Sequence, residues 1–236
     1  MRTLLAGMLV LLNLSVTPAV QAGGQPVVVE LYTSQGCSSC PPADALLEQL
    51  AQRDDVIALA LHVDYWDYIG WKDSFGDPAY SARQRSYARA SGMRTIYTPQ
   101  MVVAGKDHVI GNEAMKLADL INAHRSKPSE VELQISRNGS KLAISVKSVS
   151  SQILPRKMVL QLVHFDPHKD VKITRGENHG RTISYANIVR TWKQIGSWNG
   201  RSTKKLTIDL QGNEGPVAVI LQTDEHGPII AAAQLR

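Results

Sequence analysis

Two nearly continuous apolar runs stand close to the start of the chain, VVVELYT at residues 27–33 and VIALALHV at residues 56–63. Such runs are typical of strands that are covered on both faces. The residues between them carry a single apolar helical face, formed by Ala43, Leu46, Leu47, Leu50 and Ala51. This succession of strand, helix and strand predicts a βαβ unit with parallel strands.

Four more elements are predicted before residue 127. A helix begins at Pro78 and ends near Gly92, since proline suits a first turn and glycine follows a last one. The stretches at 98–105 and 108–111 predict a strand pair, and the segment 113–125 predicts a last helix. The first half is therefore expected to have the order βαβαββα.

The pattern then changes to strict alternation of apolar and polar residues. VELQISRNGSKLAISVKSV contains Asn138-Gly139 between two alternating segments, which predicts a β-hairpin. The same period of two recurs in KMVLQLVHF, TKKLTIDL, VAVILQTD and IIAAAQL. A β-sandwich of six or seven strands is expected over residues 128–236.

The first 22 residues have the composition of a secretory signal peptide: a basic start, an apolar core and the small-residue ending VQA. We therefore expect a periplasmic or secreted protein. No later apolar run approaches the roughly 20 residues of a membrane-spanning helix, so we expect no membrane insertion once the signal is removed.

Charge is distributed unevenly between the two halves. Residues 23–127 contain 10 basic and 12 acidic side chains, whereas residues 128–236 contain 15 and 9. This asymmetry favours two domains, 23–127 and 128–236. The basic residues are scattered over alternating segments without interleaved aromatic residues, so nucleic acid is not an expected partner.

Cys37 and Cys40 are the only cysteines, and they lie where the first strand leads into the first helix. The start of a helix offers unpaired N–H groups and a positive dipole end, both of which stabilise a thiolate. We predict thiol–disulfide exchange, with Cys37 as the nucleophile and Cys40 as the resolving thiol. The expected partners are protein or small-molecule thiols and disulfides, with no cofactor and no metal site.

Two other interpretations remain open. A structural disulfide would make the chain a binding module, because disulfides are common in exported proteins. A copper-handling protein would use the two thiols, with His62 as a further ligand. Both interpretations use the same cysteines as the catalytic one.

The motif and its position resemble the thioredoxin superfamily over residues 23–127. The resemblance implies a cis proline at Thr98-Pro99, facing the cysteines, with Thr98 binding a substrate chain. It also implies that Glu30, the acid of the first strand, relays protons to the second cysteine.

Five aromatic residues gather in the segment YWDYIGWKDSF at 65–75. They follow the second parallel strand and so leave the sheet at the same edge as the cysteine turn. Two interpretations are available: a substrate-binding rim that uses Trp66 and Tyr68, or packing of the segment against the sheet. The polar segment TRGENHGRTISY at 174–185 is expected to be a loop, and a contact with the first domain is one hypothesis for it.

Over nearly the whole mature chain, the sequence resembles the secreted, thioredoxin-like family of domain of unknown function 1223. The resemblance is carried by ELYTSQGCSSCPPAD, HVDYWDYIGWKDSF, YTPQMVV and RGENHGRTISY. It implies export, a cysteine pair and an α/β thioredoxin-like domain followed by an all-β, sandwich-like domain.

Overall fold

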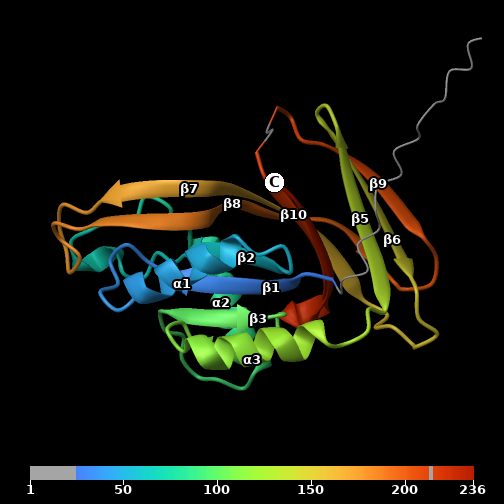
Figure 1. The fold of residues 1–236 in the computed structure, drawn as a ribbon, viewed down its shortest axis with the longest axis horizontal. Helices are drawn as coiled ribbons and strands as arrows, with labels where there is room; N and C mark the ends of the chain where they lie inside the picture. The colour runs from blue at the N-terminus through green and yellow to red at the C-terminus, as the bar shows by residue number, and fades with distance from the viewer. Residues whose placement is uncertain (1–24, 213–214) are drawn as a thin grey trace, which may run out of the picture.

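The computed structural model describes residues 25–212 and 215–236; the predicted signal peptide, residues 1–22, lies outside this part (Figure 1). The first half contains β1 (Val27–Thr33), α1 (Pro41–Ala51), β2 (Val56–His62), η1 (Asp67–Ile69), α2 (Pro78–Ala90), β3 (Gln100–Val103), β4 (Asp107–Ile110) and α3 (Ala114–Arg125). The second half contains β5 (Val131–Asn138), β6 (Lys141–Ser148), β7 (Met158–Lys172), β8 (Thr182–Trp198), β9 (Lys204–Asp209), β10 (Val217–Thr223), η2 (Asp224–His226) and β11 (Ile229–Leu235).

One large mixed sheet organises the described chain. Its eight strands follow the order β11-β10-β7-β8-β2-β1-β3-β4, and β5, β6 and β9 form a separate three-stranded sheet. β1 and β2 are parallel, as predicted, whereas β1 and β3 are antiparallel. The two halves of the sheet meet where Ala60 of β2 pairs in parallel with Ile188 of β8.

The predicted fold class is wrong. The order of elements expected for the first half is observed, but the protein is mostly β, with three α-helices in its described part. Strands from both halves form one sheet, so a thioredoxin-like domain followed by a β-sandwich does not describe it. The cause is β8, a 17-residue strand that lies beside β2 and extends the sheet. The domain limits 23–127 and 128–236 themselves stay a prediction.

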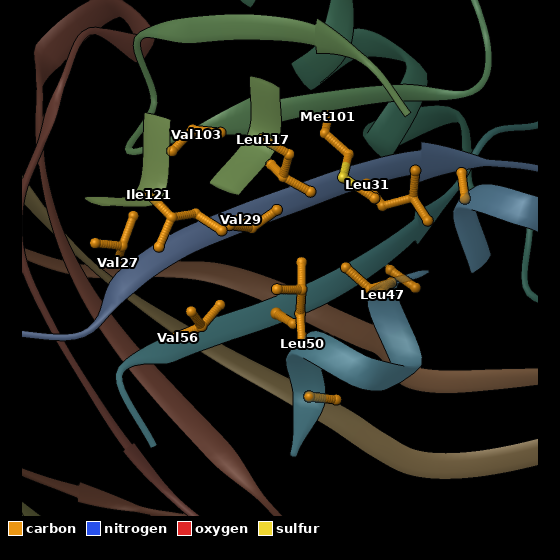
Figure 2. Packing of buried hydrophobic residues seen from close by; sticks show 14 of the residues in the cluster. Val27, Val29, Leu31, Leu47, Leu50, Val56, Met101, Val103, Leu117 and Ile121 are labelled. Carbon is orange, nitrogen blue, oxygen red and sulfur yellow. The ribbon is translucent and has the colours of Figure 1, made fainter. Parts of the chain in front are cut away.

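Alternate residues of β1 face opposite sides of the large sheet. Val27, Val29 and Leu31 pack against α1 and α3, where Leu47 and Ile121 complete the cluster (Figure 2). All seven residues of β1 are buried, because helices cover both faces of this part of the sheet. This arrangement fixes which residues of β1 approach α1.

The opposite face is covered by α2. Val28 and Tyr32 of β1 pack there with Tyr80 and Tyr87 of α2. The three-stranded sheet lies at one end of the molecule and buries residues such as Leu142 against β7 and β10 (Figure 1). The part of the chain described here has no helix that is both long and apolar enough to cross a membrane.

Candidate functional site

Cys37 and Cys40 lie in the turn between β1 and α1, as predicted, and are joined by a disulfide. Cys40 is the N-cap of α1, and its carbonyl oxygen accepts hydrogen bonds from the N–H groups of Ala43 and Asp44 at 2.8 and 3.1 Å. Pro41 begins the helix at a position where a missing N–H costs nothing. The disulfide thus lies at the positive end of α1, where an opened thiolate is stabilised.

Side chains from two distant segments hold the turn that leads into Cys37. The N–H of Gln35 donates to the carboxylate of Asp73 at 2.8 Å, and its side-chain oxygen accepts from Trp71 at 2.9 Å. The amide of Asn178 donates to the carbonyl oxygens of Gln35 and Cys37 at 3.0 and 2.9 Å. The backbone around Cys37 is therefore fixed by contacts that no local pattern reveals.

The disulfide is almost completely covered. Cys37 is 1% exposed and Cys40 is 0% exposed. A Cβ atom at Gly36 would lie 3.3 Å from Trp66 and 3.3 Å from Ile69, so the aromatic segment lies directly over the turn. A side chain at position 36 would require Trp66 and Ile69 to shift by a few tenths of an ångström.

A surface cavity of about 440 Å³ adjoins the cysteine turn. It is lined by Ser39, Tyr97, Thr98, Pro99, Ile110 and Asn112. The exposed Ser39 belongs to the motif itself, and its hydroxyl lies 3.4 Å from the sulfur of Cys37. The Thr98–Pro99 bond is cis, as the resemblance implies.

The aromatic segment has two parts. The indole N–H of Trp66 donates to the hydroxyl of Thr98 at 2.7 Å, and Tyr68, which is 80% exposed, stacks on Trp66. Trp71 and Phe75 instead pack inward against residues of the β7–β8 hairpin. The structure thus gathers Trp66, Tyr68, Thr98 and Pro99 beside the cysteine turn, while the rest of the segment is a packing element.

Glu30 does not lie with the cysteines. Its carboxylate accepts two hydrogen bonds from the guanidinium of Arg83, at 2.7 and 2.9 Å, and others from Tyr32 and Tyr87. Glu30 shares the α2 face of the sheet with Tyr32, whereas α1 covers the other face. Because neighbouring residues of a strand point to opposite faces, Glu30 is directed away from α1 and its N-cap, Cys40.

A different acid occupies the cysteine side of the sheet. Asp44 lies one helical turn after Cys40, is 3% exposed, and neither of its oxygens makes a hydrogen bond of ordinary length. Two more buried polar atoms near it have no hydrogen-bond partner in the described chain: Nε2 of His62 and the Tyr185 hydroxyl. A buried polar group without a partner is costly, so a cluster of them requires an explanation.

The environment of Asp44 changes its acidity. Burial raises the pKa of Asp44 to about 7; His62 and Thr33 act in the opposite direction, and Asp73 adds to the rise. The carboxyl group is therefore partly protonated near neutrality. His62 bonds Asp73 through Nδ1 at 2.8 Å. Burial opposes ionisation of Asp73, but His62 and hydrogen bonds from Gln35 and Phe75 hold its pKa below the usual value.

Sequence reasoning missed Asp44 and Asn178 as members of this site. Asp44 precedes Leu47 by three residues and Ala51 by seven, so it lies on the apolar face of α1. An acid on an apolar helical face was the available signal. Asn178 carried a weaker signal: the segment that contains it reads as a polar loop that contacts the first domain, which is confirmed, but the pattern does not indicate which residue makes the contact.

The described residues contain no group of three or more His, Cys, Asp or Glu side chains placed to hold a metal ion. Nδ1 of His62 bonds Asp73. The part of the chain that the structure describes therefore offers no set of three ligands that would support the copper interpretation.

These features define a mostly β protein whose large mixed sheet carries a disulfide at the N-terminus of a helix. The family model described as "Protein of unknown function (DUF1223)" matches residues 28–222, and the chain belongs to this family.

Two solved structures share the fold over most of the chain. A crystal structure of an Agrobacterium tumefaciens protein is 32% identical, with a TM-score of 0.77 over 89% of this chain and 93% of that one. HBP35 of Porphyromonas gingivalis is 16% identical, with a TM-score of 0.59 over 91% of this chain and 76% of that one. The second likeness concerns the fold alone. No curated protein matches the sequence.

Proposed function

We propose that the protein exchanges thiols and disulfides through Cys37 and Cys40 in the periplasm or outside the cell. The observation that carries this proposal is a disulfide between residues only three apart, at the start of an 11-residue helix and beside a cavity. A bridge that closes so short a loop constrains the unfolded chain little. Its position at the helix start instead favours a reactive thiolate.

In the reducing direction, the thiolate of Cys37 attacks one sulfur of a substrate disulfide. A mixed disulfide forms, and the other substrate sulfur leaves as a thiolate that takes up a proton. Cys40 then loses its proton and attacks the sulfur of Cys37, which releases the second substrate sulfur. Two electrons pass from the protein dithiol to the substrate, and a protein or small-molecule dithiol restores the reduced pair. The reverse sequence oxidises a substrate dithiol.

We assign the proton transfer at Cys40 to Asp44 in place of Glu30. Asp44 lies one turn below Cys40 on the buried side of α1, and its pKa of about 7 allows it to accept and return a proton near neutrality. The unpartnered atoms of His62 and Tyr185 provide further polar sites in the same buried region.

Substrate contact is assigned to the rim of the cavity. Thr98 and Pro99 line it, and Trp66 is held against Thr98. Tyr68 projects outward from this rim and offers a large apolar surface to a bound chain. An extended polypeptide that carries a disulfide is the substrate that best uses these contacts.

The wild-type protein is expected to accelerate the reduction of insulin by dithiothreitol. Replacement of Cys37 by serine should abolish this acceleration, so that insulin is reduced at the rate given by dithiothreitol alone. The nucleophilic sulfur is lost while the fold is retained, because the bridge adds little stability. Cys40→Ser is the matched control and should trap a mixed disulfide with insulin at Cys37. Equal rates for wild type and Cys37→Ser would contradict the proposal.

A second candidate is a binding module with a structural disulfide. Its support is the 1% exposure of Cys37 and the hydrogen bonds that Asn178 makes to the turn. Catalytic exchange, by contrast, requires the turn to expose the sulfur of Cys37 to a substrate.

Alkylation separates the two candidates. We expect 1 mM glutathione at pH 7 to open the bridge of the folded protein, after which iodoacetamide labels Cys37 before Cys40. The label is located by mass spectrometry, with circular dichroism to verify that the fold is intact. A bridge that opens only once the protein is unfolded would favour the binding module.

A further inference from the structure

The tip of the β7–β8 hairpin reaches the cysteine turn through Asn178. This side chain is 1% exposed, although its segment is a polar loop far from Cys37 in sequence. Its amide donates to the carbonyls of Gln35 and Cys37, and its own oxygen accepts from Arg181 at 3.2 Å. Every polar atom of the Asn178 side chain is thus engaged, and both of its donated bonds go to the turn.

The carbonyl oxygen of Cys37 has two donors of unequal quality. The N–H of Cys40 lies 3.3 Å from it, whereas the amide of Asn178 lies 2.9 Å from it. The bond from Cys40 is the longer and weaker of the two. A buried carbonyl that loses its partners pays the cost of desolvation, so without Asn178 this oxygen would retain the N–H of Cys40.

We propose that Asn178 is a positioning residue for Cys37: it satisfies the Cys37 carbonyl so that the N–H of Cys40 is free to turn toward the sulfur of Cys37 when the disulfide opens. A thiolate at the start of a helix depends on such N–H donors. The inference rests on the proposed exchange function and adds a residue to it. Asn178 acts on the backbone and does not contact the reacting sulfurs.

Removing the amide should therefore make Cys37 less acidic in the reduced protein. A lost hydrogen bond to a charged group corresponds to a pKa rise of about one unit. Four charged or titratable side chains lie around the turn: Asp44 of α1, His62 of β2, Asp73 of the aromatic segment and Arg181 of the hairpin tip. Arg181 is the one that bonds Asn178, and it loses its acceptor in a variant at this position. A cation released beside the turn would lower the pKa of Cys37, so a rise in that pKa is the effect of the lost amide.

The test uses the full mature chain, reduced with dithiothreitol and freed of it, with iodoacetamide as the probe. For Asn178→Ala we expect the alkylation profile of Cys37 to move up by about one pH unit, and the rate at pH 6 to fall about tenfold. The reduction potential against glutathione should become more negative, because the reduced form loses stabilisation. Asn178→Ser, which is too short to reach both carbonyls, replaces the alanine variant if that one fails to fold.

Asn187→Gly is the matched control. Asn187 is also buried and donates to a backbone carbonyl, that of Ala58 at 2.9 Å, within the sheet. Its φ of 48° suits glycine, so the substitution removes the amide without straining the backbone. We expect this variant to lose stability while the alkylation profile and the potential stay at the wild-type values.

The outcomes are distinct. A variant at Asn178 that is less stable but keeps the wild-type profile and potential would overturn the positioning role and leave the exchange function intact. A wild-type bridge that glutathione does not open would overturn the proposed function itself, and the positioning role with it.

Discussion

Replacing Arg83 by methionine is expected to lower the free energy of unfolding by about 3 to 5 kcal/mol. Arg83 is 7% exposed and forms two hydrogen bonds with the fully buried Glu30. It also donates to Gln222 of β10, and its guanidinium lies 3.7 Å from the ring centre of Trp192 in β8. The substitution leaves the carboxylate of Glu30 buried without its counter-charge, which is the costly way to break a buried ion pair. Urea denaturation at pH 7 measures the change.

An exposed ion pair supplies the control. Arg125 bonds Asp55 at 2.7 Å, but its side chain is 48% exposed. Arg125→Met should cost no more than about 1 kcal/mol, because solvent screens such a pair. Similar losses at positions 83 and 125 would show that the Glu30–Arg83 pair does not hold α2 and the two halves of the sheet together.

A substitution at Glu30 distinguishes a structural role of this residue from a role in exchange. Glu30→Gln should also destabilise the protein, but insulin reduction by the folded variant should stay within about twofold of wild type, because Glu30 faces α2. The role that the thioredoxin resemblance implies for this residue requires the opposite, a large loss of exchange. A steep fall in rate without a fall in stability would restore Glu30 to the site.

The sequence located the cysteine turn but could not orient the strand before it. Residues 27–33 are apolar on both faces, and such a run carries no alternation to indicate which side a given residue takes. Glu30 was therefore assigned to the cysteines by resemblance, although it lies one residue out of phase with Leu31, which faces α1. Asp44 was visible only as an acid on an apolar helical face.

The fold class failed for a related reason. Alternation with period two predicts strands and their buried faces, but not the sheet that each strand joins. β8 is the decisive strand: Asn187 and Gly196 interrupt its apolar pattern, and its neighbour β2 lies over 100 residues earlier. Asn178 belongs to the same long-range arrangement, since the β7–β8 hairpin brings its tip to the cysteine turn. Contacts of this kind depend on the assembled sheet and not on local sequence.

Asp44→Asn is expected to make the oxidised protein more stable at pH 8 by about 4 kcal/mol and to leave its stability unchanged near pH 4. Burial raises the pKa of Asp44 from 3.8 to about 7, so the folded protein holds this proton more tightly than the unfolded chain does. The contribution of this proton to the stability of the wild-type protein is complete below pH 4 and is lost as the pH rises through 7. The variant does not lose stability in this way, because asparagine has no charge to desolvate.

Denaturation curves of both proteins between pH 4 and pH 8 provide the measurement. Asp73, whose pKa is lowered, contributes a slope of the opposite sign in both proteins, so most of its effect is removed in the difference. The difference between variant and wild type should grow as the pH rises from 4 and level off above pH 7. Parallel curves would mean that Asp44 is not a buried acid with a raised pKa.

The rate of exchange should fall in Asp44→Asn although the stability of the protein rises. Because asparagine cannot accept the proton of Cys40, we expect insulin reduction at pH 7 to fall about 100-fold in Asp44→Asn, the usual effect of losing an acid–base group. If Asp44 served only in packing, its replacement would lower the stability of the protein and would not change the rate of exchange. Greater stability combined with slower exchange is what a site that sacrifices stability for reactivity should give, and it would place the buried cluster around Asp44 within the working site.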